Sequence, residues 1–158
     1  MGSKKTTDRV IDILNLVYTA EIGAIGIYMD QHAKMDDRGI KKFAERLKED
    51  AVHEMKHAEE LMERILFVGG TMRYEKHEVP VPMMENIKDI VRLNIDIEER
   101  AIKRLNAGIK ICFEDGDHGS RMLLESILKD EEKHLDEYET LQENIQAYGD
   151  NYIVTHLI

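Results

Sequence analysis

Apolar side chains recur every three or four residues over four long stretches of the chain. That spacing places them on one face of an α-helix, so the pattern predicts four amphipathic helices. A helix of about 28 residues is near 42 Å long at roughly 1.5 Å per residue. The predicted helices cover residues 7–35, 39–68, 84–113 and 120–148.

The connections between these stretches indicate how the helices are arranged. Residues 36–39, Asp-Asp-Arg-Gly, form a turn so short that the first two helices must be antiparallel neighbours. A long segment without helical period follows Gly69-Gly70 and contains Pro80 and Pro82. About 15 extended residues reach on the order of 50 Å, so this segment can run the length of a bundle. We therefore expect an all-α fold, a four-helix bundle with one long crossover between helices two and three, which is the ferritin-like topology.

The end of the chain adds one short element. Residues 114–120 form a turn-rich connector, and Gly149 closes the fourth helix. Asp150 can then cap a fifth helix of barely two turns, which is too short to be stable alone. Its apolar residues require docking on its own bundle or on a neighbouring subunit. Nothing indicates a second domain, so residues 1–158 are expected to form a single one.

Each apolar stripe is interrupted by a carboxylate near its middle. In the second and fourth helices a histidine follows that carboxylate by three residues, which places both groups on one side of the helix. One such pair arises easily by chance, but here a shift of 77 residues maps all three members of the first half onto the second. The pattern indicates two equivalent hairpins that face one another across a shared site. Its members are Glu21, Glu54 and His57, then Glu98, Glu131 and His134.

Six ionisable groups in the middle of a bundle need charge compensation, because burying an unpaired carboxylate is costly. Oxygen-rich sites with one imidazole per metal suit iron or manganese, whereas structural zinc prefers ligands rich in Cys and His. One Glu from each of two helices plus Glu-x-x-His from each of the others is the di-iron carboxylate pattern. In it, Glu54 and Glu131 bridge two Fe ions, Glu21 and His57 hold one ion, and Glu98 and His134 hold the other.

The composition narrows the class of protein. Hydrophobic residues make up 42% and charged residues 34% of the 158 residues, as is typical of a folded helical protein. The net charge of −10 argues against a nucleic-acid surface and suits metal cations. The single cysteine, Cys112, cannot form an internal disulfide and is interpreted as a small core residue in a reducing compartment. The N-terminus lacks a signal peptide, and no apolar run approaches the roughly 20 residues that span a bilayer, so we expect a cytoplasmic protein and no membrane contact.

Three segments, Glu21–Tyr28, Asp50–Leu66 and Ile127–His134, resemble bacterioferritin, and the similarity extends over nearly the whole chain. The resemblance implies a homo-oligomeric shell of about two dozen subunits, built from dimers. It implies an intrasubunit di-iron centre that oxidises Fe²⁺ with O₂ or H₂O₂, and a cavity that stores the ferric mineral. A ferredoxin-type protein is the candidate reductant.

The resemblance also assigns Met55 to a second cofactor. In bacterioferritin, the methionine directly after the bridging glutamate ligates a b-type haem that two subunits share across a twofold interface. Met55 follows Glu54, and about 100° of helix rotation directs it away from the di-iron ligands. Alternatively, Met55 packs in a dimer seam, because methionine is common in interfaces as well as being an axial haem ligand.

Further residues near the predicted centre complete these expectations. Tyr28 is expected to support the site, with its hydroxyl bonded to Asp50. Bacterioferritins often carry more redox-active aromatic residues, but this chain has no Trp and has Leu61 where a second tyrosine is expected. Glu49 and His53, four residues apart, are candidates for an inner-surface iron site or, alternatively, for a solvated pair.

Three functions are compatible with these ligands. The leading hypothesis is iron storage with ferroxidase activity. The second is a rubrerythrin-like di-iron peroxidase or oxidase without mineral storage, although rubrerythrins usually carry a four-cysteine module that a chain with one cysteine cannot form. The third is a metal-buffering helical bundle that holds a redox-inert metal and has no oxidase activity.

Overall fold

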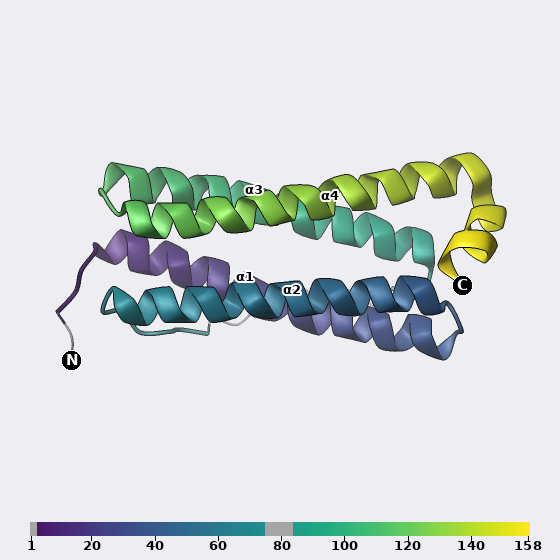
Figure 1. The fold of residues 1–158 in the computed structure, drawn as a ribbon, viewed down its shortest axis with the longest axis horizontal. Helices are drawn as coiled ribbons and strands as arrows, with labels where there is room; N and C mark the ends of the chain where they lie inside the picture. The colour runs from purple at the N-terminus through teal and green to yellow at the C-terminus, as the bar shows by residue number, and fades with distance from the viewer. Residues whose placement is uncertain (1–2, 75–83) are drawn as a thin grey trace.

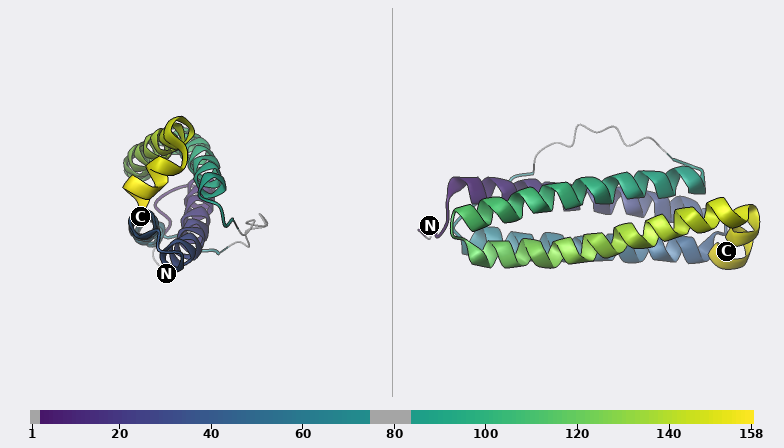
Figure 2. Two further views of the ribbon diagram at one scale, coloured as in Figure 1. Left: turned by 90° about the vertical axis from the view of Figure 1, so that its right-hand side faces the viewer. Right: turned by 90° about the horizontal axis from the view of Figure 1, so that it is seen from above.

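Four long helices make up the described part of the chain, residues 3–74 and 84–158 of a computed structural model. They are α1 (Asp8–Asp37), α2 (Lys41–Phe67), α3 (Ile87–Glu114) and α4 (His118–Tyr152), followed by a π-helical turn, η1 (Ile153–Leu157). α1 and α2 form one antiparallel hairpin and α3 and α4 the other, and the hairpins lie side by side along their length (Figures 1 and 2). The prediction of an all-α four-helix bundle is confirmed.

The crossover connects opposite ends of this bundle. α2 ends at the left of Figure 1 and α3 begins at the right, so these two helices run parallel, as the sequence predicted. The first crossover residues lie along α1, where the buried Asn15 side chain donates to the carbonyl oxygen of Thr71 at 3.1 Å. The same side chain accepts from the backbone N–H of Arg73 at 2.6 Å. Residues 75–83, which include both prolines of the chain, lie outside the described residues.

Helix ends follow local sequence signals. Thr7, Asn86 and Asp117 stand directly before α1, α3 and α4, and each side chain accepts a hydrogen bond from a backbone N–H of the first turn. Gly69 follows α2 with φ of 82°, in the left-handed region, and a Cβ there would come within 3.0 Å of the backbone of Lys4. The chain therefore needs glycine at that turn both for its backbone angle and for its close contact with the N-terminal segment.

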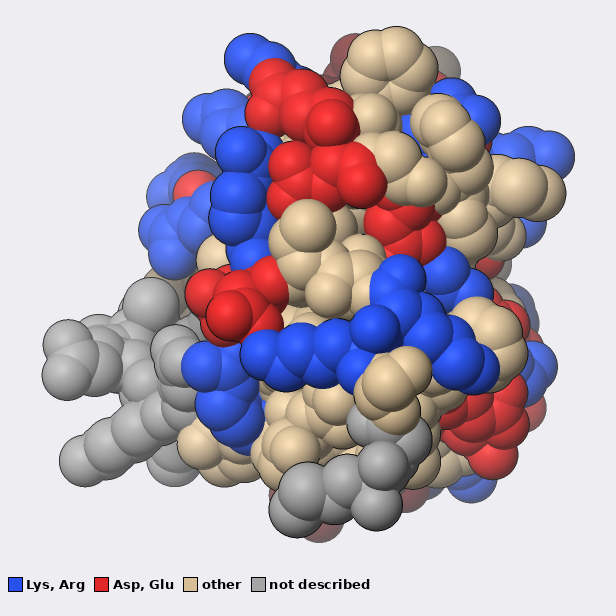
Figure 3. All heavy atoms as spheres, turned by 90° about the vertical axis from the view of Figure 1, so that its left-hand side faces the viewer, with Lys and Arg blue, Asp and Glu red and all other residues tan. Residues whose placement is uncertain are grey.

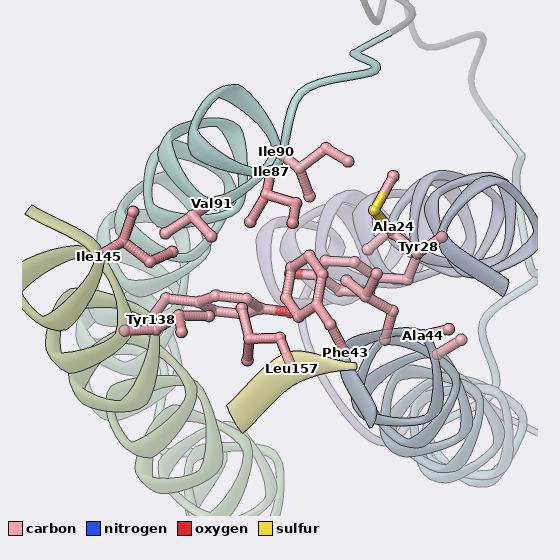
Figure 4. Close-up of a cluster of buried hydrophobic side chains, with 14 residues drawn as sticks. Ala24, Tyr28, Phe43, Ala44, Ile87, Ile90, Val91, Tyr138, Ile145 and Leu157 are labelled. Carbon is pink, nitrogen blue, oxygen red and sulfur yellow. The ribbon is translucent and has the colours of Figure 1, made fainter. Parts of the chain in front are cut away.

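The C-terminal residues dock on their own bundle. As the sequence predicted, the regular fourth helix is interrupted at Gly149, where φ is 59° and ψ is −143°; the last residues of α4, up to Tyr152, form a short helical piece beyond this kink. The kink turns the chain across the end of the bundle, towards α2 (Figure 1). Leu157, in the π-helical turn, is buried near Phe43 and Tyr138 (Figure 4). This contact supplies the stability that so short a segment lacks alone.

Two hydrophobic cores fill the bundle on either side of its middle. We call the first the tyrosine core, because it contains Tyr28 and Tyr138, together with residues from all four helices and Leu157 near the C-terminus (Figure 4). We call the second the aliphatic core; it lies toward the other end of the bundle and includes the buried Cys112, as predicted. The aliphatic core consists of Val10, Ile11, Leu14, Val17, Leu61, Ile65, Val68, Leu105, Cys112, Leu124 and Ile127.

α1 is more apolar than the sequence reading allowed. An 18-residue window of this helix has a mean hydropathy of 1.6, which by length and composition is enough to cross a membrane. That corrects the expectation that no apolar run approaches such a length. Of that window, 44% is buried within the bundle, and the helix also buries Asn15, Glu21 and Gln31. A single helix of this kind is weak evidence for a membrane span, because a core helix of a bundle passes the same test.

Charged residues tie the helix ends together at the end of the bundle shown in Figure 3, where acidic and basic side chains intermingle. Arg64 on α2 donates to Asp117 at 2.6 Å and to the hydroxyl of Ser120 at 2.9 Å. Although burial alone would raise the pKa of Asp117, hydrogen bonds from Ser120 and Arg64 hold this pKa below its usual value. Asp117 therefore joins α4 to the first hairpin in addition to capping its own helix.

Replacing Asp117 by Ala should lower the free energy of unfolding by about 1–2 kcal/mol, because it removes both the helix cap and the partner of Arg64. The folded-state pKa of Asp117 is lowered, so its contribution is complete above the unfolded-state value of about 4 and is lost as the pH falls below it. Thermal unfolding at neutral and acidic pH measures the difference in stability between the wild type and Asp117→Ala. The control is Glu143→Gln, at an exposed position of the same helix. A stability difference between wild type and Asp117→Ala that becomes larger in acid would contradict the role given to the ionised Asp117.

Candidate metal centre

The structure brings the six predicted ligands together between the two hydrophobic cores. Each helix contributes one glutamate, and each Glu-x-x-His pair lies on one face of α2 or α4, as its spacing requires. All six side chains are buried, none more than 5% exposed. Their ligand atoms form two overlapping groups, each within 4.8 Å: Glu21, Glu54, His57 and Glu131, and Glu54, Glu98, Glu131 and His134.

Glu54 and Glu131 belong to both groups. The Nδ1 atom of His57 lies 3.1 Å from a Glu54 oxygen and 3.4 Å from a Glu131 oxygen. The Nδ1 atom of His134 lies 3.0 Å from the other Glu131 oxygen and 3.5 Å from the other Glu54 oxygen. Each of these two carboxylates thus presents one oxygen toward each histidine, as a bridge between two cations requires.

Glu21 and Glu98 each approach one histidine only. A Glu21 oxygen is 3.7 Å from Nδ1 of His57, and a Glu98 oxygen is 3.9 Å from Nδ1 of His134. These glutamates therefore occupy terminal positions, one at each end of the centre. Both histidines direct the same nitrogen, Nδ1, inward, so the two halves of the centre are equivalent in their inner ligands.

Without a metal, the centre must hold protons to limit its negative charge. Burial, with the neighbouring carboxylates, raises the pKa values of Glu21 and Glu98 well above their usual range. Burial would lower the pKa of an imidazole, but the surrounding carboxylates, Glu131 first, raise that of His134 to about 11 and also raise that of His57. Hydrogen bonds from Glu21 and both histidines lower the pKa of Glu54 despite its burial.

The donor set fits two divalent cations. Four carboxylates carry a charge of −4 when ionised, which two divalent ions balance while both imidazoles are neutral ligands. Oxygen donors with one imidazole per ion match iron or manganese better than structural zinc. In the described part of the chain, these residues form the only candidate groups whose members are all buried.

Two tyrosines adjoin the centre on the side of the tyrosine core. The sequence predicted a bond between Tyr28 and Asp50, but Tyr28 instead donates its hydroxyl hydrogen to Glu98. Asp50 accepts from Tyr138 on α4, and Arg46 approaches it to 3.3 Å. The prediction was wrong because it placed Tyr28 toward α2, whereas its hydroxyl reaches α3. The two tyrosine rings lie nearly parallel, with centroids 6.5 Å apart.

The polar residues Tyr28, Asp50 and Tyr138 have no polar equivalents on the side of the aliphatic core. The 77-residue relation that duplicates the ligands pairs each polar member with an aliphatic residue of the aliphatic core. The two ligand halves are thus alike, but their surroundings are not. The pairs are Tyr28 with Leu105, Asp50 with Ile127, and Tyr138 with Leu61.

The remaining predicted residues lie outside the centre. Met55 is 55% exposed on the outer side of α2 and is directed away from the ligands. Glu49 is also exposed, and the structure does not group it with His53. His53 contacts His134 instead, with its Nδ1 atom 3.3 Å from Nε2, and it forms a third group with Asp50.

Sequence reasoning missed Asp130, which lies 3.0 Å from Nε2 of His57. The same 77-residue relation contained the signal, because it pairs Asp130 with His53 just as it pairs His134 with His57.

Comparison with known proteins identifies the class of this bundle. The family model of the ferritin-like domain matches residues 11–147. The chain is 34% identical to the bacterioferritin of Desulfovibrio desulfuricans over 145 residues, 92% of this chain and 80% of that one. It is 34% identical to the bacterioferritin of Streptomyces coelicolor over 94% of this chain and 89% of the relative, and to bacterioferritin BfrA of Mycobacterium tuberculosis over 89% and 88%. The chain therefore belongs to the bacterioferritin family of ferritin-like proteins.

Replacing Glu98 by Gln should stabilise the metal-free protein, by roughly 1–2 kcal/mol at neutral pH, because glutamine is neutral in the buried site without taking up a proton and keeps an oxygen that accepts from Tyr28. A carboxyl pKa raised in the folded state means that stability is lost as the pH rises above the unfolded-state value of about 4.3. The advantage of the variant should therefore grow with pH. Thermal unfolding after chelation measures it.

The matched control is Glu99→Gln, which removes the same charge from the next, exposed position of α3. It should leave the unfolding midpoint of the metal-free protein nearly unchanged. Added Co²⁺ should stabilise the wild type and the control much more than Glu98→Gln. Equal stabilisation of all three proteins would show that Glu98 is not a ligand.

Proposed function

We propose that this protein stores iron, and that it oxidises Fe²⁺ to Fe³⁺ at the buried centre with O₂ or H₂O₂ before the ferric product is stored as mineral inside an oligomeric shell. The observation that carries the proposal is the set of six buried side chains, in which two carboxylates reach both histidines. Membership of the bacterioferritin family supports the same function.

Each ligand has a distinct part in this reaction. Two Fe²⁺ ions held side by side can give two electrons to one oxidant molecule. Glu54 and Glu131 fix the separation of the two substrate ions, because each spans both positions. Glu21 and Glu98 bind at the ends, and the histidines anchor one ion each while coordination positions remain open for the oxidant. Tyr28 holds Glu98 through its hydroxyl and thereby fixes one end of the centre.

Replacing Glu131 by Ala should reduce aerobic Fe²⁺ oxidation to the rate seen in buffer without protein, because the variant loses one of the two bridging groups. Absorbance of the ferric product after addition of Fe²⁺ follows the reaction. The control is Glu132→Ala, which removes the same side chain from the adjacent, exposed position. Rapid oxidation by Glu131→Ala would disprove the assignment.

The same assay separates the competing functions. Peroxide consumption without accumulation of a ferric mineral would favour a rubrerythrin-like peroxidase. Metal binding without any oxidation of Fe²⁺ would favour a metal-buffering bundle.

The proposed shell requires contacts between copies of the chain. Several apolar side chains on the outer side of α2 are exposed, among them Val52, Met55 and Leu66. Their exposure in the single chain supports association with further copies, since large apolar side chains exposed along one helix are typical of interaction surfaces. We place the assembled homo-oligomer of about 24 subunits in the cytoplasm, with a ferredoxin-type protein as the electron donor for iron release.

We further propose that Met55 ligates a b-type haem shared with a second copy of the chain. Its thioether is exposed on the outer side of α2, next to Val52 one turn away, so the immediate surroundings suit a large apolar group. The haem would supply a path for electrons, while Met55 would hold its iron from one side.

Met55→Leu should abolish haem binding while leaving the di-iron centre intact, because leucine keeps the volume but lacks the sulfur ligand. The absorbance spectrum of the purified, reduced protein measures bound haem. Met62→Leu, on the same helix, is the control. Haem bound equally by Met55→Leu would contradict this assignment.

A further inference from the structure

The two ligating histidines are held from outside by different groups. Nε2 of His57 lies 3.0 Å from a carboxylate oxygen of Asp130 on α4. Nε2 of His134 lies 3.3 Å from Nδ1 of His53 on α2, and the two imidazole rings are within 13° of parallel. The inner contacts of the histidines are equivalent, so the difference is confined to their outward nitrogens.

These two outer groups occupy equivalent positions in the duplicated sequence. The relation that maps His57 onto His134 also maps His53 onto Asp130. Each outer group therefore lies four residues before one ligating histidine and contacts the other, across the interface of α2 and α4. The chain has a carboxylate at one of these equivalent positions and an imidazole at the other.

This difference changes how well each histidine binds a cation. A histidine that binds metal through Nδ1 carries its proton on Nε2 and donates it outward. A carboxylate acceptor fixes the ring orientation and makes the inner nitrogen more basic, and such partners are typically worth about 10–100-fold in metal affinity. His53 presents an imidazole nitrogen in place of a carboxylate, at a longer distance, so it orients the His134 ring less firmly and raises the basicity of the inner nitrogen less.

A second difference also weakens cation binding at the position of Glu98 and His134. Glu98, the terminal carboxylate beside His134, already accepts a hydrogen bond from Tyr28, which draws charge away from a bound cation. The residue equivalent to Tyr28 is Leu105, which cannot donate to Glu21. Arg104 weakens cation binding at the position of Glu21 instead, because its half-buried guanidinium lies close enough to Glu21 to interact with its charge. That effect acts over distance, whereas Asp130 touches the ligand itself.

The group formed by Asp50, His53 and His134 is better suited to support the centre than to bind a third cation. Its one carboxylate, that of Asp50, already accepts a hydrogen bond from Tyr138 and is paired with Arg46. The neighbouring guanidinium balances the charge that a cation would need. His53 is thus left to act on His134.

We infer that the two cation positions have unequal affinities, with the position of Glu21 and His57 tighter than that of Glu98 and His134, and that Asp130 and His53 are the positioning residues that set this difference. The inference rests on the cation centre of the proposed function but not on its redox activity. The tighter position fills first, so the second cation, next to the tyrosine core, is the one that exchanges more readily.

Titration of the metal-free protein with Co²⁺, followed by calorimetry and visible absorbance, tests the inference. Two binding steps per chain are expected, with dissociation constants that differ by roughly 10–100-fold. Asp130→Asn should weaken the tighter step by a similar factor and leave the weaker step in place. His53→Asp should tighten the weaker step, so that the two steps approach one another.

Two controls separate a direct contact from a general effect of charge or shape. Glu132→Gln removes one negative charge from the exposed position on the other side of Glu131 and should alter neither step. His53→Asn has the shape of the aspartate variant without its charge and should not tighten the weaker step.

The inference is overturned by two equal steps in the wild type, by equal effects of Asp130→Asn and Glu132→Gln, or by a weaker step that His53→Asp leaves unchanged. Two unequal Co²⁺ steps in a protein that fails to oxidise Fe²⁺ would support the inference and count against the proposed function alone.

Discussion

The concentration of four carboxylates in the middle of the bundle is the constraint on which the rest of the structure depends. Each would be unstable there alone, because transfer of an ionised carboxylate from water to a protein interior costs several kcal/mol even after relaxation. The centre can be neutralised by protons, as the raised pKa values of Glu21 and His134 indicate, or by two divalent cations. A cation that replaced these protons would stabilise the folded state, because it would bind the assembled centre and not the unfolded chain.

The two hydrophobic cores make this arrangement possible. They lie on either side of the centre along the bundle, so the apolar burial that stabilises the fold is interrupted only at its middle. The caps at Thr7, Asn86 and Asp117 then set where three of the four helices begin, and so the height at which each glutamate lies. A centre to which four helices contribute needs all four in register; α2, which starts without a side-chain cap, is held in place by the short turn that joins it to α1.

Most of the fold, and the meeting of the six candidate ligands at one height, could be predicted from the sequence because both follow from periodicity. The turn between α3 and α4 lies midway between Glu98 and Glu131, so an antiparallel hairpin necessarily brings these residues to one height. Contacts that depend on the rotation of each helix and on side-chain direction were not predictable in this way. Tyr28 is the clearest case, since its place in the stripe of α1 allowed contact with either α2 or α3, and only the packing showed that its hydroxyl reaches Glu98.

The outer contacts were harder still, because they involve exposed or half-exposed residues that no apolar stripe marks. Asp130 is one of 32 acidic residues, and nothing in its local sequence distinguishes it from Glu132. His53 was associated with Glu49 because they are one helical turn apart, whereas the structure pairs it with a residue of another helix. Repetition within the sequence was the more informative signal in both cases, since it relates positions in space that local spacing cannot.

The duplication also shows where the two halves of the centre have diverged. The inner residues of the two halves are the same: each half has two glutamates and one histidine in equivalent places. At the equivalent buried positions around them, one side has Leu61, Leu105 and Ile127, while the other has two tyrosines and Asp50. From Asp50 the polar contacts continue through Arg46 to Glu137, and both of these residues line a surface cavity of about 330 Å³. Leu61, Leu105 and Ile127 offer no such polar contacts, and on the side of Glu21 and His57 the surface is reached instead through the exposed Asp130, which contacts His57. The candidate ligands are thus equivalent on the two sides of the centre, and the difference between the sides comes from the residues that surround them.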